Sequence, residues 1–173
     1  KFEEDGVIVM EEKPSYYLYR ETWRGASQLG LFATVSCDEY DQGKIKKHEF
    51  TRQDKEDDRT RHITLLGAQS GPVFLTFKSK EEIKNILSSM VDKYEKIYDL
   101  TDENEVRHEL WIVNGDEDIE TIQKAFEGVD NLYIADGHHR AASASRTQKI
   151  KMEENSNHNG TEEYNFFLAA IFP

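Results

Sequence analysis

The sequence predicts an α/β (α+β) fold in which helices flank a mixed β-sheet. Segments of strand character alternate with helical segments along most of the chain, and two pairs of strand-like segments are close enough to form hairpins. A strand–turn–helix unit at residues 132–144 supports the same class, because an apolar run passes through Asp136-Gly137 into an alanine-rich helix. At 173 residues the chain is long enough to form a core, so we interpret 1–173 as a single domain.

The first structured segment is a predicted β-hairpin at residues 15–37. Its two strands are expected at 15–23 and 29–37, around a turn at residues 25–28. The turn-rich residues 38–43 predict a loop. A core that contains the candidate functional turn is then expected from residue 44 to residue 150.

Within that core, Thr51 is a candidate cap for a charged helix at residues 52–66, and Ser79 for an amphipathic helix at 79–94. A buried strand is predicted at 73–77. The remaining segments are antiparallel strands at 96–100 and 106–113, a helix at 116–126, a buried strand at 132–135, a helix from about 138 to 151, a loop at 152–163 and a final buried strand at 164–172.

Composition limits the cellular setting. Hydrophobic residues make up 37% and charged residues 32%, which predicts a lean core and a charged surface. No apolar run is long enough to span a membrane and no basic-then-apolar segment opens the chain, so we expect a cytoplasmic protein without a membrane partner. Cys37, the single cysteine, cannot form an internal disulfide and is interpreted as a small packing residue. Because the chain starts at Lys1 without a methionine and stops at Pro173 just after a strongly apolar run, we expect it to be a piece of a longer protein, its N-terminal part.

Net charge argues against a nucleic-acid partner. The chain carries 34 acidic and 22 basic side chains, a formal net charge of −12. Affinity for a phosphate backbone depends on neutralisation by lysine and arginine, and no basic run with interleaved aromatic residues is present.

The turn after the strand at 132–135 contains five consecutive residues suited to an anion site: Asp136, Gly137, His138, His139 and Arg140. At the amino end of a helix, free N–H groups and the helix dipole favour a phosphate. Gly137 allows the backbone to approach a ligand closely, and Arg140 offers a planar fork for phosphate oxygens. The simpler interpretation is Asp136 as a helix cap followed by a solvated basic turn.

Glu49 is the candidate general base. It follows Lys46, Lys47 and His48 in a basic stretch of an otherwise acidic chain, just upstream of the helix at 52–66. A surface glutamate paired with a neighbouring lysine is the ordinary alternative. If this stretch folds over residues 136–140, its carboxylate would meet a substrate held against bound phosphates.

Several sequence landmarks together resemble a known family. They are Tyr19-Arg20, Lys47-His48-Glu49-Phe50-Thr51, Asp58-Arg59, Gln69 with Pro72-Val73-Phe74-Leu75, His108-Glu109-Leu110-Trp111 and Tyr133-Ile134-Ala135-Asp136-Gly137-His138-His139-Arg140. In number and order they are similar, over nearly the whole chain, to an uncharacterised bacterial family, domain of unknown function 1015.

The Asp-Gly-His-His-Arg turn also resembles the phosphate-binding motif of the ParB/sulfiredoxin-like superfamily, which includes an archaeal free-serine kinase. This resemblance implies a ParB/sulfiredoxin-like core and a catalytic role for Glu49, because a glutamate in a Pro-His-Glu context is implicated in that kinase. Here Lys47 replaces the proline. The family landmarks imply substrate contacts for Tyr19, Arg20, His108 and Trp111, although for His108 a packed core role stays open.

Three functions follow from these residues. The first is a phosphotransferase that uses ATP or ADP and transfers a phosphoryl group to a small hydroxyl metabolite such as serine. Its catalytic residues would be Glu49, His48 and Asp136, and Mg²⁺ held by Asp136 or by the phosphates would complete the site. The second is a nucleotide-binding switch or scaffold without turnover. The third is a metal-dependent hydrolase or nuclease with His48, His138, His139 and either Asp136 or Glu49 as ligands, ranked lower because adjacent histidines in one turn rarely both reach one metal. The oligomeric state stays open.

Overall fold

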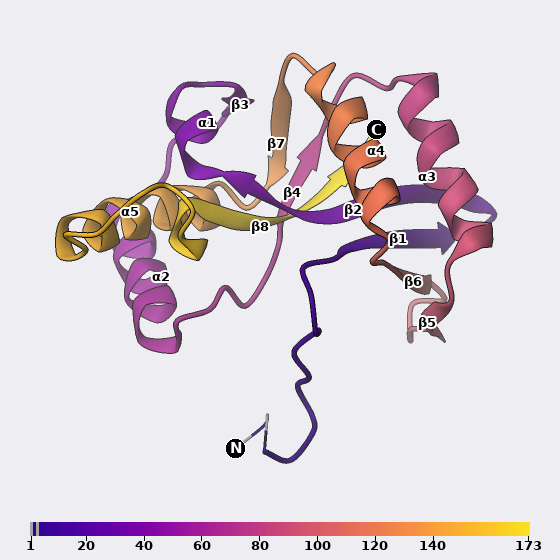
Figure 1. The fold of residues 1–173 in the computed structure, drawn as a ribbon, viewed down its shortest axis with the longest axis horizontal. Helices are drawn as coiled ribbons and strands as arrows, with labels where there is room; N and C mark the ends of the chain where they lie inside the picture. Colours follow the sequence, from indigo (N-terminus) through magenta and orange to yellow (C-terminus); the bar gives the residue numbers. More distant parts are fainter. Residues whose placement is uncertain (1, 3) are drawn as a thin grey trace.

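A computed structural model describes residues 2 and 4–173 and contains an eight-stranded mixed β-sheet with helices packed against it (Figure 1). The elements in chain order are β1 Tyr16–Trp23, β2 Ala26–Ser36, α1 Cys37–Asp41, β3 Ile45–Lys46, α2 Gln53–Leu66, β4 Val73–Thr76, α3 Glu81–Lys93, β5 Lys96–Thr101, β6 Arg107–Val113, α4 Asp116–Glu127, β7 Leu132–Asp136, α5 His138–Glu154, the 3-10 helix η1 Glu163–Asn165 and β8 Phe166–Phe172.

The strand order across the sheet is β3-β7-β4-β8-β2-β1-β6-β5. Two neighbouring pairs, β3 with β7 and β4 with β8, are parallel, and the other pairs are antiparallel. The structure therefore confirms the predicted mixed sheet. The last strand of the chain, β8, lies in the interior of the sheet between β4 and β2.

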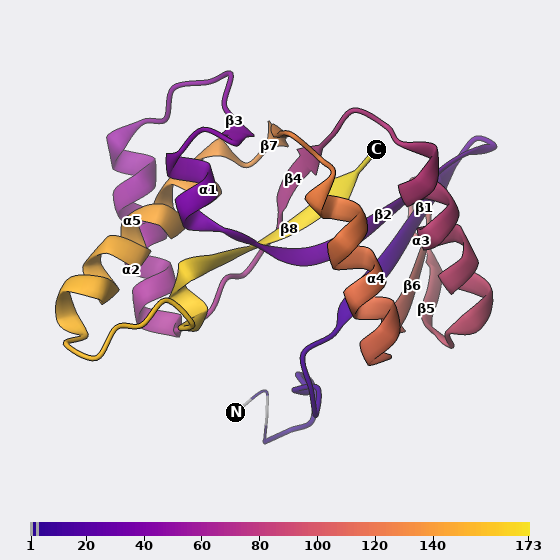
Figure 2. The ribbon, with the colours of Figure 1, turned by 45° about the horizontal axis from the view of Figure 1, so that its top comes forward.

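The helices form two groups (Figures 1 and 2). One group, α1, α2 and α5, lies near the β3–β7 end of the sheet, and α3 and α4 lie nearer the β5–β6 end. Between helices and sheet the apolar core includes Leu18, Leu31, Leu75, Ile134 and Phe167. Because strand side chains alternate between faces, the neighbours of these residues lie on the opposite face.

That opposite face carries a row of aromatic contacts. Phe74 of β4 meets Phe172 of β8 edge-on at 5.4 Å between ring centroids, and Phe172 meets Tyr19 of β1 at 6.1 Å. Gly30 leaves room for this row, since a Cβ there would lie 2.8 Å from the Phe172 ring. The face opposite the helices is therefore partly apolar.

The predicted loop at 38–43 is wrong in part, because Cys37–Asp41 forms the short helix α1. The Ser36 hydroxyl accepts hydrogen bonds from the N–H groups of Asp38 and Glu39, which caps a helix too short to show a periodic apolar pattern.

Two predicted helix caps are also wrong. The N-cap residues of α2 and α3 are Arg52 and Lys80, neither of which makes a side-chain capping bond. The hydroxyl of Thr51, just before the N-cap residue of α2, instead donates to the carboxylate of Glu56.

The strand at 132–135, predicted as buried, is buried on one face only. In β7 only Ile134 is buried, and Tyr133 is 46% exposed. Among the helices of the described chain, none combines the length and apolar character needed to cross a membrane.

Candidate functional site

The parallel pairing of β3 with β7 brings Glu49 to the Asp136–Arg140 turn. Lys46 pairs with Tyr133, and the N–H of Leu132 donates to the carbonyl of Lys44 at 3.1 Å. The chain after β3 therefore runs beside the end of β7. Glu49 Oε2 lies 3.6 Å from His138 Nδ1, so sequence-distant candidate residues meet at one place.

Gly137 gives the turn its shape. Its φ of +96° lies in the left-handed region, which strains any residue with a Cβ. A Cβ there would also lie 2.8 Å from Arg140 Nη2. Gly137 precedes α5 without a side-chain cap, and its carbonyl accepts the first helical hydrogen bond, from Ala141 at 3.0 Å. The N–H groups of residues 138–140 consequently have no intrahelical acceptor.

His138 is buried, with 4% of its side chain exposed. Its Nε2 accepts a hydrogen bond from the backbone N–H of His48 at 3.4 Å, which places the proton of the neutral ring on Nδ1, facing Glu49. Burial lowers the pKa of His138, with a further lowering from nearby His48. His138 is therefore held neutral, with Nδ1–H directed at the candidate base.

His139 connects the turn to α2. Its Nε2 accepts a hydrogen bond from the N–H of Arg52, the N-cap of α2, at 3.2 Å. One turn later, the hydroxyl of Ser143 donates to the carbonyl of His139 at 2.7 Å and lies 3.3 Å from the carbonyl of Glu56 in α2. These contacts hold α2 against α5, so that Arg59 lines the same cavity as Arg140.

That cavity, of about 180 Å³, is lined by Glu49, Arg59 and all five residues of the turn. Arg140 Nη2 donates to Asp136 Oδ2 at 2.8 Å, but Arg140 Nε is buried without a hydrogen-bond partner. Arg59 is exposed and has no hydrogen-bond or ion-pair partner among the described residues. The cavity thus combines unused cationic donors with free helix amides. None of the predicted site residues lines the larger cavities of about 670, 490 and 400 Å³.

Not every predicted neighbour of Glu49 faces this cavity. The ammonium group of Lys47 lies 3.5 Å from the centre of the Tyr40 ring, a cation–π contact with α1. The ring of His48 packs edge-on against His138, with centroids 4.4 Å apart. His48 therefore supports the position of His138 through its backbone and its ring.

The four predicted substrate-contacting residues lie on β1 and β6, several strands from the turn, and on opposite faces of the sheet. Tyr19 and His108 share the face opposite the core, where the Tyr19 hydroxyl lies 2.6 Å from His108 Nδ1. Arg20 packs over the ring of Trp111 on the core face, 4.8 Å from its centroid. The structure joins them in two pairs and does not bring either pair to the Asp136–Arg140 turn.

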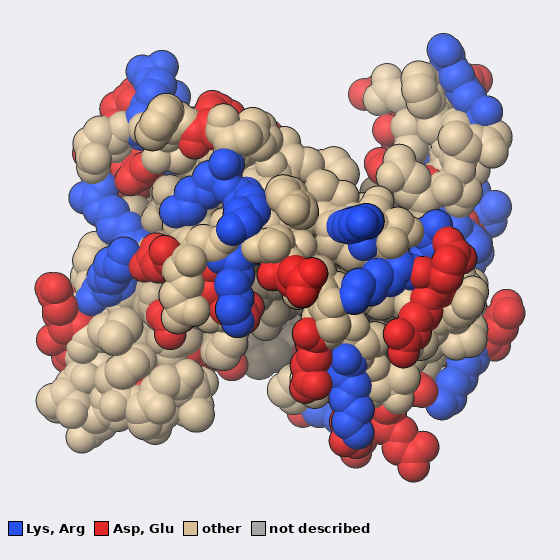
Figure 3. All heavy atoms as spheres, turned by 90° about the horizontal axis from the view of Figure 1, so that it is seen from above, with Lys and Arg blue, Asp and Glu red and all other residues tan. Residues whose placement is uncertain are grey.

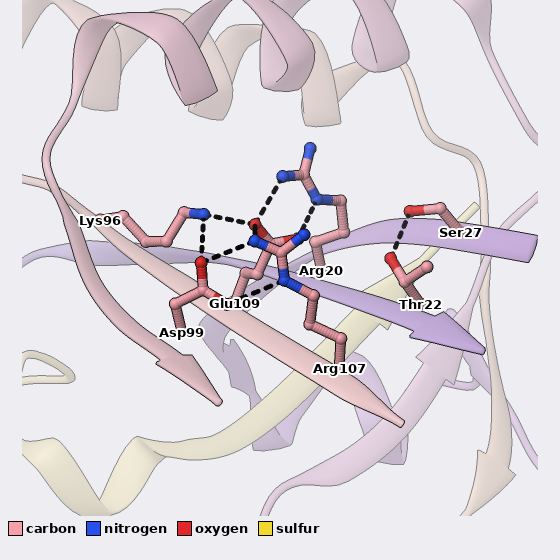
Figure 4. A network of polar contacts seen from close by, with 7 residues as sticks. All are labelled: Arg20, Thr22, Ser27, Lys96, Asp99, Arg107 and Glu109. Carbon is pink, nitrogen blue, oxygen red and sulfur yellow. Dashed lines mark hydrogen bonds and ion pairs between the residues drawn. The ribbon is translucent and has the colours of Figure 1, made fainter. Parts of the chain in front are cut away.

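Arg20 belongs to a charge cluster around Glu109, which is only 1% exposed (Figure 4). The Arg20 guanidinium donates to both Glu109 oxygens, at 2.6 and 2.8 Å. Lys96 and Arg107 reach the same carboxylate and also pair with Asp99. These bonds, those from Arg20 first, lower the pKa of Glu109 to about 2. Every cation of the cluster has a carboxylate partner.

Neither Cys37 nor the metal-ligating side chains form a further site among the described residues. Cys37 is fully buried, and burial raises the pKa of its thiol to about 12, so it stays protonated and packs in the core. No group of three or more His, Cys, Asp or Glu side chains in the described chain is arranged to hold a metal ion. His48, His138 and His139 thus meet without forming such a group.

Arg59 is the cavity residue that the motif analysis missed. Its place depends on how α2 packs against α5, which no local pattern reveals. In the sequence, Arg59 stood out only as part of Asp58-Arg59, one of the family landmarks, to which no role was assigned.

Fold and site together define an α/β protein with a polar, arginine-lined turn at the amino end of a helix. The family model described as "Protein of unknown function (DUF1015)" matches residues 1–173, and the chain belongs to this family. The comparison with curated proteins and the comparison with solved structures each found no match for this chain.

Proposed function

We propose that this protein is a phosphotransferase that binds ATP or ADP at the Asp136–Arg140 turn and transfers a phosphoryl group to a small hydroxyl metabolite. The observation that carries the proposal is that a carboxylate and two arginines with unused donors line one cavity. Glu49, Arg59 and Arg140 come from three separate segments of the chain. Phosphoryl transfer depends mainly on positioning and on charge neutralisation, and these residues supply both.

Phosphate oxygens would be held by the amides of residues 138–140 and by the two guanidinium groups. The amides lack helical acceptors, and the amino end of α5 favours negative charge. Arg140 folds back over Gly137, so its planar fork lies beside these amides. This combination supports an anion ligand more strongly than a helix terminus alone would.

Glu49 would act as the general base. Its side chain is 58% exposed, so it can reach a ligand, and His138 Nδ1–H lies on its inner side. As the acceptor oxygen bonds to the terminal phosphorus, the bridging P–O bond breaks and Glu49 takes the hydroxyl proton. ATP would leave as ADP, and ADP as AMP.

The exposed carboxylate of Asp136 is a suitable oxygen ligand for Mg²⁺, which binds proteins through one or two carboxylates together with substrate phosphates. When bound, Mg²⁺ supplies charge neutralisation to the phosphates. Asp136 would then exchange its contact with Arg140 for the ion, freeing the guanidinium for phosphate.

The resemblance of the turn to the ParB/sulfiredoxin-like phosphate motif supports the same function, and through the free-serine kinase it suggests serine as an acceptor. We expect no nucleic-acid partner. Acidic and basic side chains are interspersed on the face shown in Figure 3, without a continuous basic stripe. The hydrolase alternative has no support from a metal-holding side-chain group in the described chain. A nucleotide-binding switch shares the phosphate site but has no use for Glu49.

The test is an activity assay on the purified protein with ATP or ADP, Mg²⁺ and a panel of small hydroxy acids and hydroxy-amino acids, including serine. Release of ADP or AMP that depends on the acceptor supports the proposal. Nucleotide binding without any acceptor-dependent turnover would favour the switch, and the absence of binding would refute the phosphate site.

A further inference from the structure

Two exposed aromatic side chains lie beside the phosphate turn. Phe74 is 40% exposed and Tyr133 is 46% exposed. Their sequence neighbours Leu75 and Ile134 are buried in the core, so strand alternation places both rings on the opposite face of the sheet. Large aromatic rings exposed on one face of a sheet are suited to a ligand that covers them.

Strand pairing fixes how these rings relate to the turn. Phe74 of β4 is the direct partner of Asp136, and Thr76 is the partner of Tyr133. The register shifts between Phe74 and Leu75, so the two pairs are two residues apart on β4 and three residues apart on β7. Tyr133 therefore lies diagonally across from Phe74 on the same face of the sheet. Along β7 it lies three residues before Asp136, a distance of about 10 Å at the usual rise of a strand. This is the scale that separates the phosphates of a nucleotide from its base.

Two further contacts shape this surface. Phe74 packs edge-on against Phe172, whose ring is buried, so its orientation is supported from one side. Lys46 pairs with Tyr133 across β3, is exposed and has no polar partner among the described residues. A cation therefore stands next to the outer ring, on the side that leads to Glu49.

We propose that Phe74 and Tyr133 form the base platform of the site, so that its ligand is a nucleoside diphosphate or triphosphate rather than an inorganic or sugar phosphate. This inference rests on the proposed function, because the turn must hold the phosphates. Stacking uses the π-face that every base has, so we expect ADP and GDP to bind with similar affinity.

Isothermal calorimetry on the whole chain tests the platform, with ADP, GDP and inorganic pyrophosphate as ligands. We expect ADP to bind at least about tenfold more tightly than pyrophosphate, which corresponds to about 1.4 kcal/mol. In the double variant Phe74→Leu/Tyr133→Leu this ratio should fall to about one, while pyrophosphate affinity stays unchanged. Tyr98→Leu is the matched control, because Tyr98 is 61% exposed on β5 at the far edge of the sheet.

The outcomes separate the two proposals. Equal affinities for ADP and pyrophosphate in the wild type, or an unchanged ratio in the double variant, would overturn the platform and leave the phosphate site intact. Failure of all three ligands to bind would overturn the proposed function itself. If the double variant does not fold, the same ratio of ADP to pyrophosphate affinity is measured in Tyr133→Ser alone, where it should also fall. Tyr133 is exposed, and its loss leaves the Phe74–Phe172 contact in place.

Discussion

The two ends of the sheet use their charges in different ways. Around Glu109, near the β5 edge, the cations Arg20, Lys96 and Arg107 all have carboxylate partners (Figure 4). Near the β3 edge, Arg59 has no partner in the described chain and Arg140 Nε is buried without one. Buried charges are costly unless they are paired, so removing one partner from the Glu109 cluster should destabilise the fold. The unused donors beside the cavity are available to a ligand.

The largest expected effect concerns the charge cluster around Glu109, near the β5 edge of the sheet. Glu109→Gln removes the shared carboxylate and leaves three cations close together, which should lower the free energy of unfolding by about 3 kcal/mol. Chemical denaturation measures this effect. Asp136→Asn is the control, since it removes an exposed pair that should contribute less than about 1 kcal/mol. An equal loss of unfolding free energy in the two variants would contradict the view that the charges around Glu109 contribute more to stability than the exposed Asp136–Arg140 pair.

The second prediction concerns catalysis at the cavity beside the Asp136–Arg140 turn. Glu49→Gln keeps the side-chain shape and removes the base, so turnover should fall by about a hundredfold or more while nucleotide affinity stays unchanged. Steady-state kinetics and calorimetry together measure this. Glu153→Gln, at an exposed position near the end of α5, should have no effect. A Glu49→Gln variant with full activity would refute the base and favour a non-catalytic switch.

A smaller effect is expected on the pH dependence of stability. Burial lowers the pKa of His138 in the folded protein, so the unfolded chain binds more protons just below pH 6.5. Stability should therefore fall as the pH drops below about 6.5. His138→Gln should reduce this dependence in thermal melts between about pH 7.5 and 5.5, and His62→Gln, at an exposed position on α2, should not. Identical slopes in the wild type and His138→Gln would contradict the assignment.

Local patterns predicted most of the elements but not their arrangement. The hairpin of β1 and β2 and the amphipathic helix α3 follow from alternation and helical periodicity. The short helix α1 was missed because its residues are typical of turns, and the interior position of β8 depends on pairings between distant segments. Long-range pairing carries no local signature.

The candidate site likewise has one part that local sequence predicts and another that depends on long-range packing. Residues 136–140 are consecutive, so their gathering at the start of α5 was predictable, whereas Arg59 reaches the cavity only through the packing of α2. Tyr19 and Arg20 are a different case. Successive strand residues face opposite sides, so the strand period of two already separated them.

Calorimetric titration of ADP into the wild type, Arg140→Ala and Arg61→Ala tests the central claim most directly. Arg61 is exposed on α2 and does not line the cavity. Arg61→Ala therefore controls for the loss of one positive charge away from the site. We predict that Arg140→Ala weakens ADP binding by more than about tenfold, with the circular dichroism spectrum unchanged, and that Arg61→Ala binds as the wild type does. An Arg140→Ala variant with wild-type affinity would contradict the account.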